Sequence, residues 1–170
     1  VVMSQAIGSR NENKAQNTVH TSVLLALISG TAVGLIGVFC AKYFLVWMKT
    51  DPEILDKATD YLFIYFIGTP ANVLYNFGAS ILRAKGDTKR PLIYLTIAGI
   101  VNVALNLLFV IVIKLDVKGV AIATIVSQYI SCILLVITLM REQGYCKLIL
   151  KKLRFHKREF ADIIKVGLPS

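Results

Sequence analysis

The sequence predicts an all-α fold: a polytopic membrane helical bundle with four full transmembrane helices and a partial helix at each end. Hydrophobic residues make up 56% of the 170 residues, and soluble domains of this size rarely reach the mean hydropathy of +0.67. Stretches of 22 or 23 residues without Asp, Glu, Lys or Arg occur at 19–41, 61–82, 91–113 and 119–140. A helix of that length measures about 33–35 Å and can cross a hydrocarbon core of about 30 Å.

With their flanking residues, these stretches predict spans at about 18–46, 57–83, 91–114 and 118–141. Asp51 and Pro52 predict the start of the second helix, because proline fits a first helical turn and an acid there complements the helix dipole. Gly30 and Gly34 form a GxxxG pattern, which indicates a close helix contact.

Two features divide the middle of the chain. Pro70 lies inside the second span and predicts a helix kink, which serves either packing alone or a hinge or cavity wall. Residues 83–91 predict a tight turn, with Gly86 just after one helix and Pro91 in the first turn of the next. A second short turn is expected at 116–119, between the third and fourth spans.

Both ends predict partial elements of a longer protein. Residues 1–8 are interpreted as the tail of an earlier span, and 161–170 as the start of a later one. Residues 143–160 are basic, and their apolar residues recur at helical spacing. This pattern predicts an amphipathic helix on the inner membrane surface. An ordinary cytosolic connector is the alternative.

The net charge of +9 does not indicate a nucleic-acid partner, because the basic residues are unevenly divided between the loops. Fourteen Lys and Arg fall on one side of the predicted membrane and five on the other. The positive-inside rule then places the basic loops in the cytoplasm and predicts membrane lipid as a partner. The three cysteines lie far apart in the sequence, at Cys40, Cys132 and Cys146. This spacing indicates side chains that only pack, with neither a disulfide framework nor a metal site.

Polar side chains inside the spans are the main functional signal, because hydrocarbon offers them no hydrogen-bond partner. They form three pairs at i, i+4 spacing, each on one helical face: Asn72 and Asn76, Asn102 and Asn106, Thr124 and Gln128. Depth along the helices predicts two facing levels, one with Asn106 beside Thr124 and one with Asn102 beside Gln128. These groups either bond the helices together or form a polar pocket for a cation or substrate.

The sequence contains none of the GxxxxGK[ST], HExxH and GxSxG motifs, so neither an ATPase nor a hydrolase is indicated. We expect no enzyme activity and no cofactor. A transporter built this way would be driven by an ion gradient. The four apolar stretches contain no carboxylate, so a cation site would need an acid from another helix or would bind weakly.

The chain contains Gly68-Thr69-Pro70 and the run LRAKGDTKRP at 82–91, followed by Asn102, Asn106 and the segment 119–124. In these residues it resembles the multidrug and toxic compound extrusion family, most strongly in the first two. Family members have twelve helices in two lobes that rock between inward- and outward-open states. The resemblance implies that 1–142 belong to the N-terminal lobe, 143–160 to the link between lobes, and 161–170 to the first helix of the C-terminal lobe.

The resemblance also implies a function. Family members export cationic or amphipathic drugs from the cell across the plasma membrane in exchange for Na⁺ or H⁺. By motif position, Asn102, Asn106 and Thr124 match polar groups of the family's cation site, although many members carry Asp where this chain has Asn106. Asn72, Asn76 and Gln128 are expected in a substrate cavity or polar network. The alternatives are an exporter of lipid-linked oligosaccharides and a membrane scaffold that does not transport.

Overall fold

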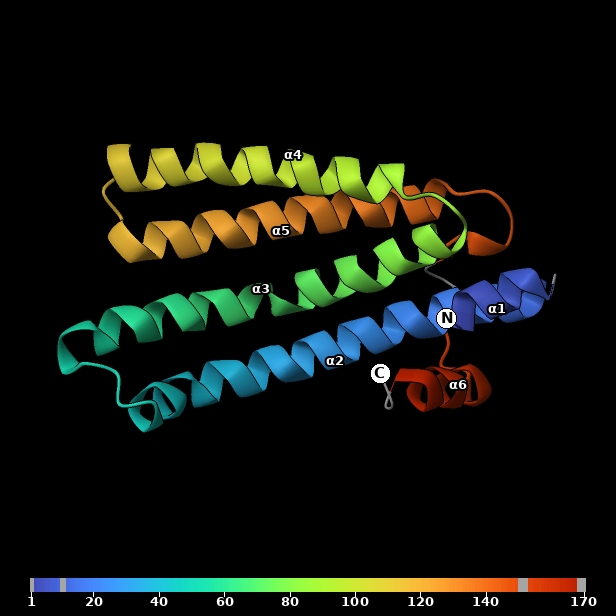
Figure 1. Ribbon diagram of the computed structural model, residues 1–170, viewed down its shortest axis with the longest axis horizontal. Coiled ribbons are helices and arrows are strands. Elements are labelled where there is room, and N and C mark those ends of the chain that lie inside the picture. The colour runs from blue at the N-terminus through green and yellow to red at the C-terminus, as the bar shows by residue number, and fades with distance from the viewer. Residues whose placement is uncertain (1, 10–11, 150–152, 168–170) are drawn as a thin grey trace.

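The computed structural model is a bundle of long helices lying side by side, and it describes residues 2–9, 12–149 and 153–167 (Figure 1). In the order α2, α3, α5, α4, each long helix packs against the next. The described residues contain helices, turns and connecting loops, and no strand. The elements in chain order are α1 (Val2–Gly8), α2 (Glu12–Trp47), α3 (Pro52–Ala84), α4 (Lys89–Asn106), the π-helical η1 (Leu107–Val112), α5 (Asp116–Arg141), the 3₁₀ turn η2 (Gly144–Cys146) and α6 (Lys157–Gly167).

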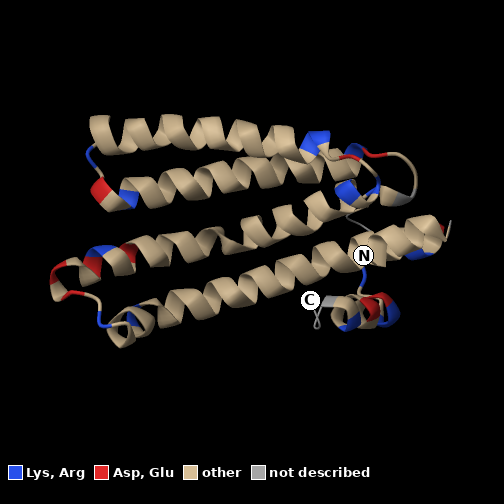
Figure 2. Ribbon diagram, viewed as in Figure 1, with Lys and Arg blue, Asp and Glu red and all other residues tan. Residues whose placement is uncertain are grey.

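Among the described residues, three helical segments are long and apolar enough to cross a membrane: Glu12–Trp47, Lys89–Val112 and Asp116–Arg141. They contain most of the spans predicted at 18–46, 91–114 and 118–141. Helix α3 has 33 residues and is long enough, but two asparagines and a proline make it more polar, so the fourth span at 57–83 stays a prediction. Charged residues gather at the two ends of the bundle and leave its long middle uncharged (Figure 2).

The predicted boundaries around α3 are confirmed. Asp51 caps the helix by accepting a 3.0 Å hydrogen bond from the Glu53 amide, and Pro52 is its first residue. Gly86 follows α3 with a φ of +95°, a conformation that glycine adopts without the steric cost of a Cβ atom. The predicted turn at 116–119 is wrong, because α5 already begins at Asp116 and the connection lies at 113–115.

The GxxxG pattern is confirmed as the contact between α2 and α3. A methyl group built on Gly30 would come within 2.8 Å of the Pro70 Cα, and one on Gly34 within 2.9 Å of the Phe66 carbonyl oxygen. Pro70 has no N–H, so the Phe66 carbonyl lacks its usual hydrogen bond within α3. The backbone of α2 approaches α3 at this interrupted turn. The helix continues through Pro70, and the glycines let α2 approach it closely.

The interfacial helix predicted over 143–160 is wrong in the residues that the structure describes, and its residues 150–152 lie outside them. After the short turn η2, residues 147–149 and 153–156 are not helical, and α6 begins only at Lys157. Cys146 and Leu148 are buried in the hydrophobic core, and the Leu148 amide donates a 2.9 Å hydrogen bond to the Leu139 carbonyl. Two of the apolar side chains that suggested a lipid-facing helix therefore pack into the protein, since Leu148 lies in the core and Leu153 packs against it.

This segment also binds α2. The Ile149 amide donates a 3.1 Å hydrogen bond to Nε2 of the buried His20. Helix α6 lies beside α2, where Lys14 and Asp162 form a 3.2 Å ion pair. Helix α6 overlaps the element predicted at 161–170, whose last three residues lie outside the described part of the chain.

Candidate functional site

The polar residues predicted for a cation site come together between α4 and α5. The Asn102 Nδ2 atom lies 3.4 Å from Thr124 Oγ1 and 3.3 Å from Ser127 Oγ, as a hydrogen-bond donor to both. One turn further along α4, Asn106 Nδ2 donates a 2.9 Å hydrogen bond to Asn102 Oδ1. Four polar side chains from two helices thus form one connected cluster, which we call the amide cluster: Asn102, Asn106, Thr124 and Ser127.

Both hydroxyl groups of the amide cluster donate to backbone carbonyls of α5. Thr124 Oγ1 donates to the Val120 carbonyl at 2.9 Å, and Ser127 Oγ to the Thr124 carbonyl at 2.7 Å. Their oxygens therefore present lone pairs to α4. At the other end of the cluster, the buried Oδ1 of Asn106 has no hydrogen-bond partner among the described residues.

The predicted pairing by depth is partly wrong. Asn102 meets Thr124 and Ser127, while Gln128 points toward α3, where its Oε1 would lie 2.7 Å from a methyl group built on Gly68. One residue along a helix is a rotation of about 100°, so Ser127 and Gln128 face different neighbours. Among the hydrogen bonds of the described residues, Asn106 is linked to Thr124 through Asn102.

Ser127 is the member of the site that sequence reasoning missed. It lies three residues after Thr124, which places both on the same helical face, and its side chain is buried. A buried serine in a membrane helix is common as a packing residue. The i, i+3 spacing from Thr124 was the available signal.

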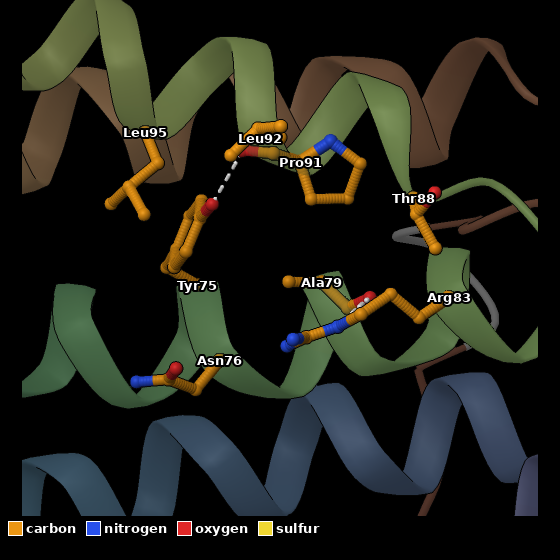
Figure 3. A pocket seen from close by; sticks show the side chains of 8 residues that line it. All are labelled: Tyr75, Asn76, Ala79, Arg83, Thr88, Pro91, Leu92 and Leu95. Atoms are coloured by element: carbon orange, nitrogen blue, oxygen red, sulfur yellow. Dashed lines mark hydrogen bonds between the residues drawn. The ribbon is translucent and has the colours of Figure 1, made fainter.

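The remaining polar residues lie on α3. Asn76 Nδ2 donates hydrogen bonds to the Asn72 backbone carbonyl at 2.9 Å and to Asn72 Oδ1 at 3.0 Å. Asn76 also lines a cavity of about 320 Å³ between α3 and α4, where the Tyr75 hydroxyl donates a 2.7 Å hydrogen bond to the Pro91 carbonyl (Figure 3). Gln128 approaches the same helix at Gly68, four residues before Asn72. The grouping of Asn72, Asn76 and Gln128 in one network stays a prediction.

The donor set of the amide cluster suits an alkali or alkaline-earth cation. Amide and hydroxyl oxygens are hard ligands of the kind that such ions prefer. Within the described residues, His, Cys, Asp and Glu form no group of three that could hold a transition metal. The unpartnered Asn106 oxygen is the atom that a cation would satisfy.

Long apolar helices with amide and hydroxyl groups meeting between them define a helical membrane protein. The MatE family model matches residues 1–108. The chain therefore belongs to the MatE family, the multidrug and toxic compound extrusion transporters.

Similar proteins agree with this assignment. The chain is 32% identical over 130 residues to the probable multidrug resistance protein YpnP of Bacillus subtilis strain 168. The matched region covers 76% of this chain and 29% of YpnP. Solved structures of a multidrug resistance MATE family transporter match it in an inward-facing conformation, with a TM-score of 0.91, and in an outward-facing one, with 0.90. Both are 25% identical and cover 99% of this chain, which spans 39% and 38% of their lengths.

Proposed function

We propose that the protein containing this chain exports cationic or amphipathic compounds across the plasma membrane in exchange for Na⁺ or H⁺. The observation that carries the proposal is the amide cluster, in which four polar side chains inside an apolar bundle leave one buried oxygen without a partner in the part of the chain that the structure describes. A buried polar group without a partner costs free energy, and a bound cation would remove that cost.

Alternating access is supported by the similarity to two conformational states. The same chain fold matches the inward-facing and outward-facing structures almost equally, with TM-scores of 0.91 and 0.90. A lobe that keeps its internal packing can move as a rigid body, and transporters with repeated halves rock such bodies around a central site. The proposal therefore requires the remaining helices of the transporter as partners of this chain.

The proposed orientation follows from charge. The loops with more basic residues would face the cytoplasm and anionic lipid, with the connections at 48–51 and 113–115 outside. Small drug-like molecules are the proposed substrates, with Asn72, Asn76 and Gln128 in the cavity or polar network. We do not propose an exporter of lipid-linked oligosaccharides, because the described cavity between α3 and α4 has one basic residue, Arg83, rather than a basic ring.

Replacing Asn102 or Thr124 with Ala should weaken gradient-driven export of a fluorescent dye by about tenfold or more. Asn102 joins the two helices of the amide cluster, and Thr124 accepts one of its hydrogen bonds, so each substitution breaks the chain of bonds that leads to Asn106. The measurement is dye efflux from cells or proteoliposomes at matched expression of the full-length protein. Unimpaired efflux in both variants would contradict the site. Lower thermal stability without a specific transport defect would instead favour a scaffold.

Replacing Asn106 with Asp should make export more sensitive to pH. The amides and hydroxyls of the amide cluster neither gain nor lose protons near neutral pH, whereas a carboxyl group can. Below neutral pH, a proton would compete with Na⁺ for the new carboxylate. We expect a steeper fall of Na⁺-driven efflux between pH 7 and pH 5 in the variant than in the parent protein, and identical pH profiles would contradict this expectation.

A further inference from the structure

The direction of every hydrogen bond in the amide cluster is fixed by the two hydroxyl groups of α5. Each hydroxyl has one proton, and both protons point to backbone carbonyls, of Val120 and of Thr124. The face that Thr124 and Ser127 present to α4 therefore accepts hydrogen bonds. Two acceptors lie 3.3 and 3.4 Å from one Asn102 atom, and only an amide nitrogen, with its two protons, satisfies both.

This arrangement sets the orientation of both asparagines in turn. With Nδ2 toward α5, Asn102 must direct its Oδ1 toward Asn106, 2.9 Å away. A carbonyl oxygen there requires a donor, so Asn106 also faces it with its nitrogen. The reverse orientation of either side chain would bring two acceptors together. The chain of bonds therefore ends in the Oδ1 of Asn106, which is buried and unpartnered among the described residues.

We propose that Ser127 is a positioning residue of the site, which with Thr124 fixes the Asn102 amide so that the cluster presents the Asn106 carbonyl oxygen as a bare acceptor for Na⁺. This inference rests on the proposed export function, adds Ser127 to its site and narrows the coupling ion from Na⁺ or H⁺ to Na⁺. A carbonyl oxygen is not protonated near neutral pH, so the ligand at this atom is a metal cation and not a proton. Hydrogen bonds in such a chain polarise one another and strengthen its terminal acceptor.

The chain offers a matched control in Ser131, one turn further along α5. Ser131 is buried like Ser127, with 4% of its surface exposed against 5%. Its hydroxyl also donates to a backbone carbonyl three residues earlier, that of Gln128 at 2.9 Å. No contact of Ser131 with Asn102 or Asn106 occurs among the hydrogen bonds of the described residues, so the two serines differ in their relation to the amide cluster.

The experiment compares Ser127→Ala with Ser131→Ala in the full-length transporter. Dye export from proteoliposomes is measured as a function of Na⁺ concentration, and thermal stability is measured in parallel. For Ser127→Ala we expect the half-saturating Na⁺ concentration to rise about five- to tenfold, as loss of one hydrogen bond to the site would give, with the maximal rate nearly unchanged. For Ser131→Ala we expect a half-saturating concentration within twofold of the parent value.

Equal Na⁺ dependence in the two variants would overturn the positioning role, whether or not both lose stability. Export that does not respond to Na⁺ in the parent protein would overturn the ligand assignment. In either case the proposed export function is judged separately, by whether Asn102→Ala and Thr124→Ala impair efflux. A rise confined to Ser127→Ala, together with impaired efflux in those two variants, supports both proposals.

Discussion

Replacing Gly30 with Ala is expected to lower the free energy of unfolding by about 1–3 kcal/mol, the range for a side chain forced into a packed contact. The added methyl group would lie 2.8 Å from the Pro70 Cα and 3.2 Å from the Val73 Cβ. The Pro70 Cα is a backbone atom and cannot change rotamer as a flexible side chain can. Helix α2 must therefore move away from α3 to make room for the methyl group. Gly34→Ala should act similarly, because its methyl group would approach the Phe66 carbonyl oxygen.

Gly99→Ala is the matched control for this substitution. Gly99 lies within α4, and a methyl group there would meet nothing within 4 Å in the described chain. Alanine favours helix over glycine by about 1 kcal/mol, so this variant should be as stable as the parent or slightly more stable. The measurement is the thermal unfolding midpoint of the purified protein in detergent. Equal shifts for Gly30→Ala and Gly99→Ala would show that the close approach of α2 to Pro70 carries little stability.

The long helices were predictable because membrane insertion requires long apolar segments, which are visible in the sequence itself. The start of α2 was harder to predict. The predicted span begins at residue 18, whereas the helix begins at Glu12, where its polar first turns lie beside α1 and α6. Contacts between elements decided that boundary, and hydropathy does not report them.

The prediction for the segment after α5 was wrong for a different reason. Apolar residues at helical spacing predicted an amphipathic helix, but spacing alone does not distinguish a helix on lipid from an irregular segment against protein. Leu148 is 2% exposed and lies in the core with Leu139, a contact between residues that hydropathy treats separately. The predicted helix was therefore right that Leu148 is covered and wrong about what covers it.

Both members of the amide cluster on α4 were predicted from the sequence, but of its two members on α5 only Thr124 was. The i, i+4 spacing of Asn102 and Asn106 correctly placed both on one face, because a single helix determines it. Depth along the axis could not determine how α5 is rotated about its own axis. That rotation places Ser127 toward Asn102 and Gln128 toward Gly68. Packing between helices sets it, so the sequence alone could not choose between adjacent residues.

The cytoplasmic end of the bundle, in the proposed orientation, is held by one buried acid. Glu142, 8% exposed, follows α5 and accepts hydrogen bonds from Lys85 and from Arg90, the latter at 2.9 Å. Arg90 also pairs with Asp87, whose Oδ1 accepts from the Arg90 amide at 3.1 Å. Three charged residues of the LRAKGDTKRP run therefore connect the turn between α3 and α4 to the end of α5.

Burial of Glu142 favours its neutral form, but hydrogen bonds and charge from Lys85 and Arg90 outweigh this effect and hold its pKa below the ordinary value. A carboxyl group whose pKa is lower in the folded state stabilises the fold above its unfolded pKa, about 4.3. That contribution is lost as the pH falls through the folded pKa. The acid therefore contributes fully at neutral pH and little in strong acid.

Glu142→Gln is expected to lower the free energy of unfolding at pH 7 by about 2–3 kcal/mol, since hydrogen bonds between charged groups contribute about 1.5–3 kcal/mol each and both basic partners are partly exposed to water. The control is Asp60→Asn, which removes the exposed ion pair with Lys118 and should cost less than about 1 kcal/mol. Thermal unfolding is followed from pH 8 to pH 3. The gap between Glu142→Gln and the parent should narrow as the pH falls from the unfolded pKa of about 4.3 through the lowered folded pKa of Glu142, because the parent acid becomes neutral as well over that range. A gap that persists unchanged to pH 3 would mean that the shape of the side chain, and not its charge, joins the two turns.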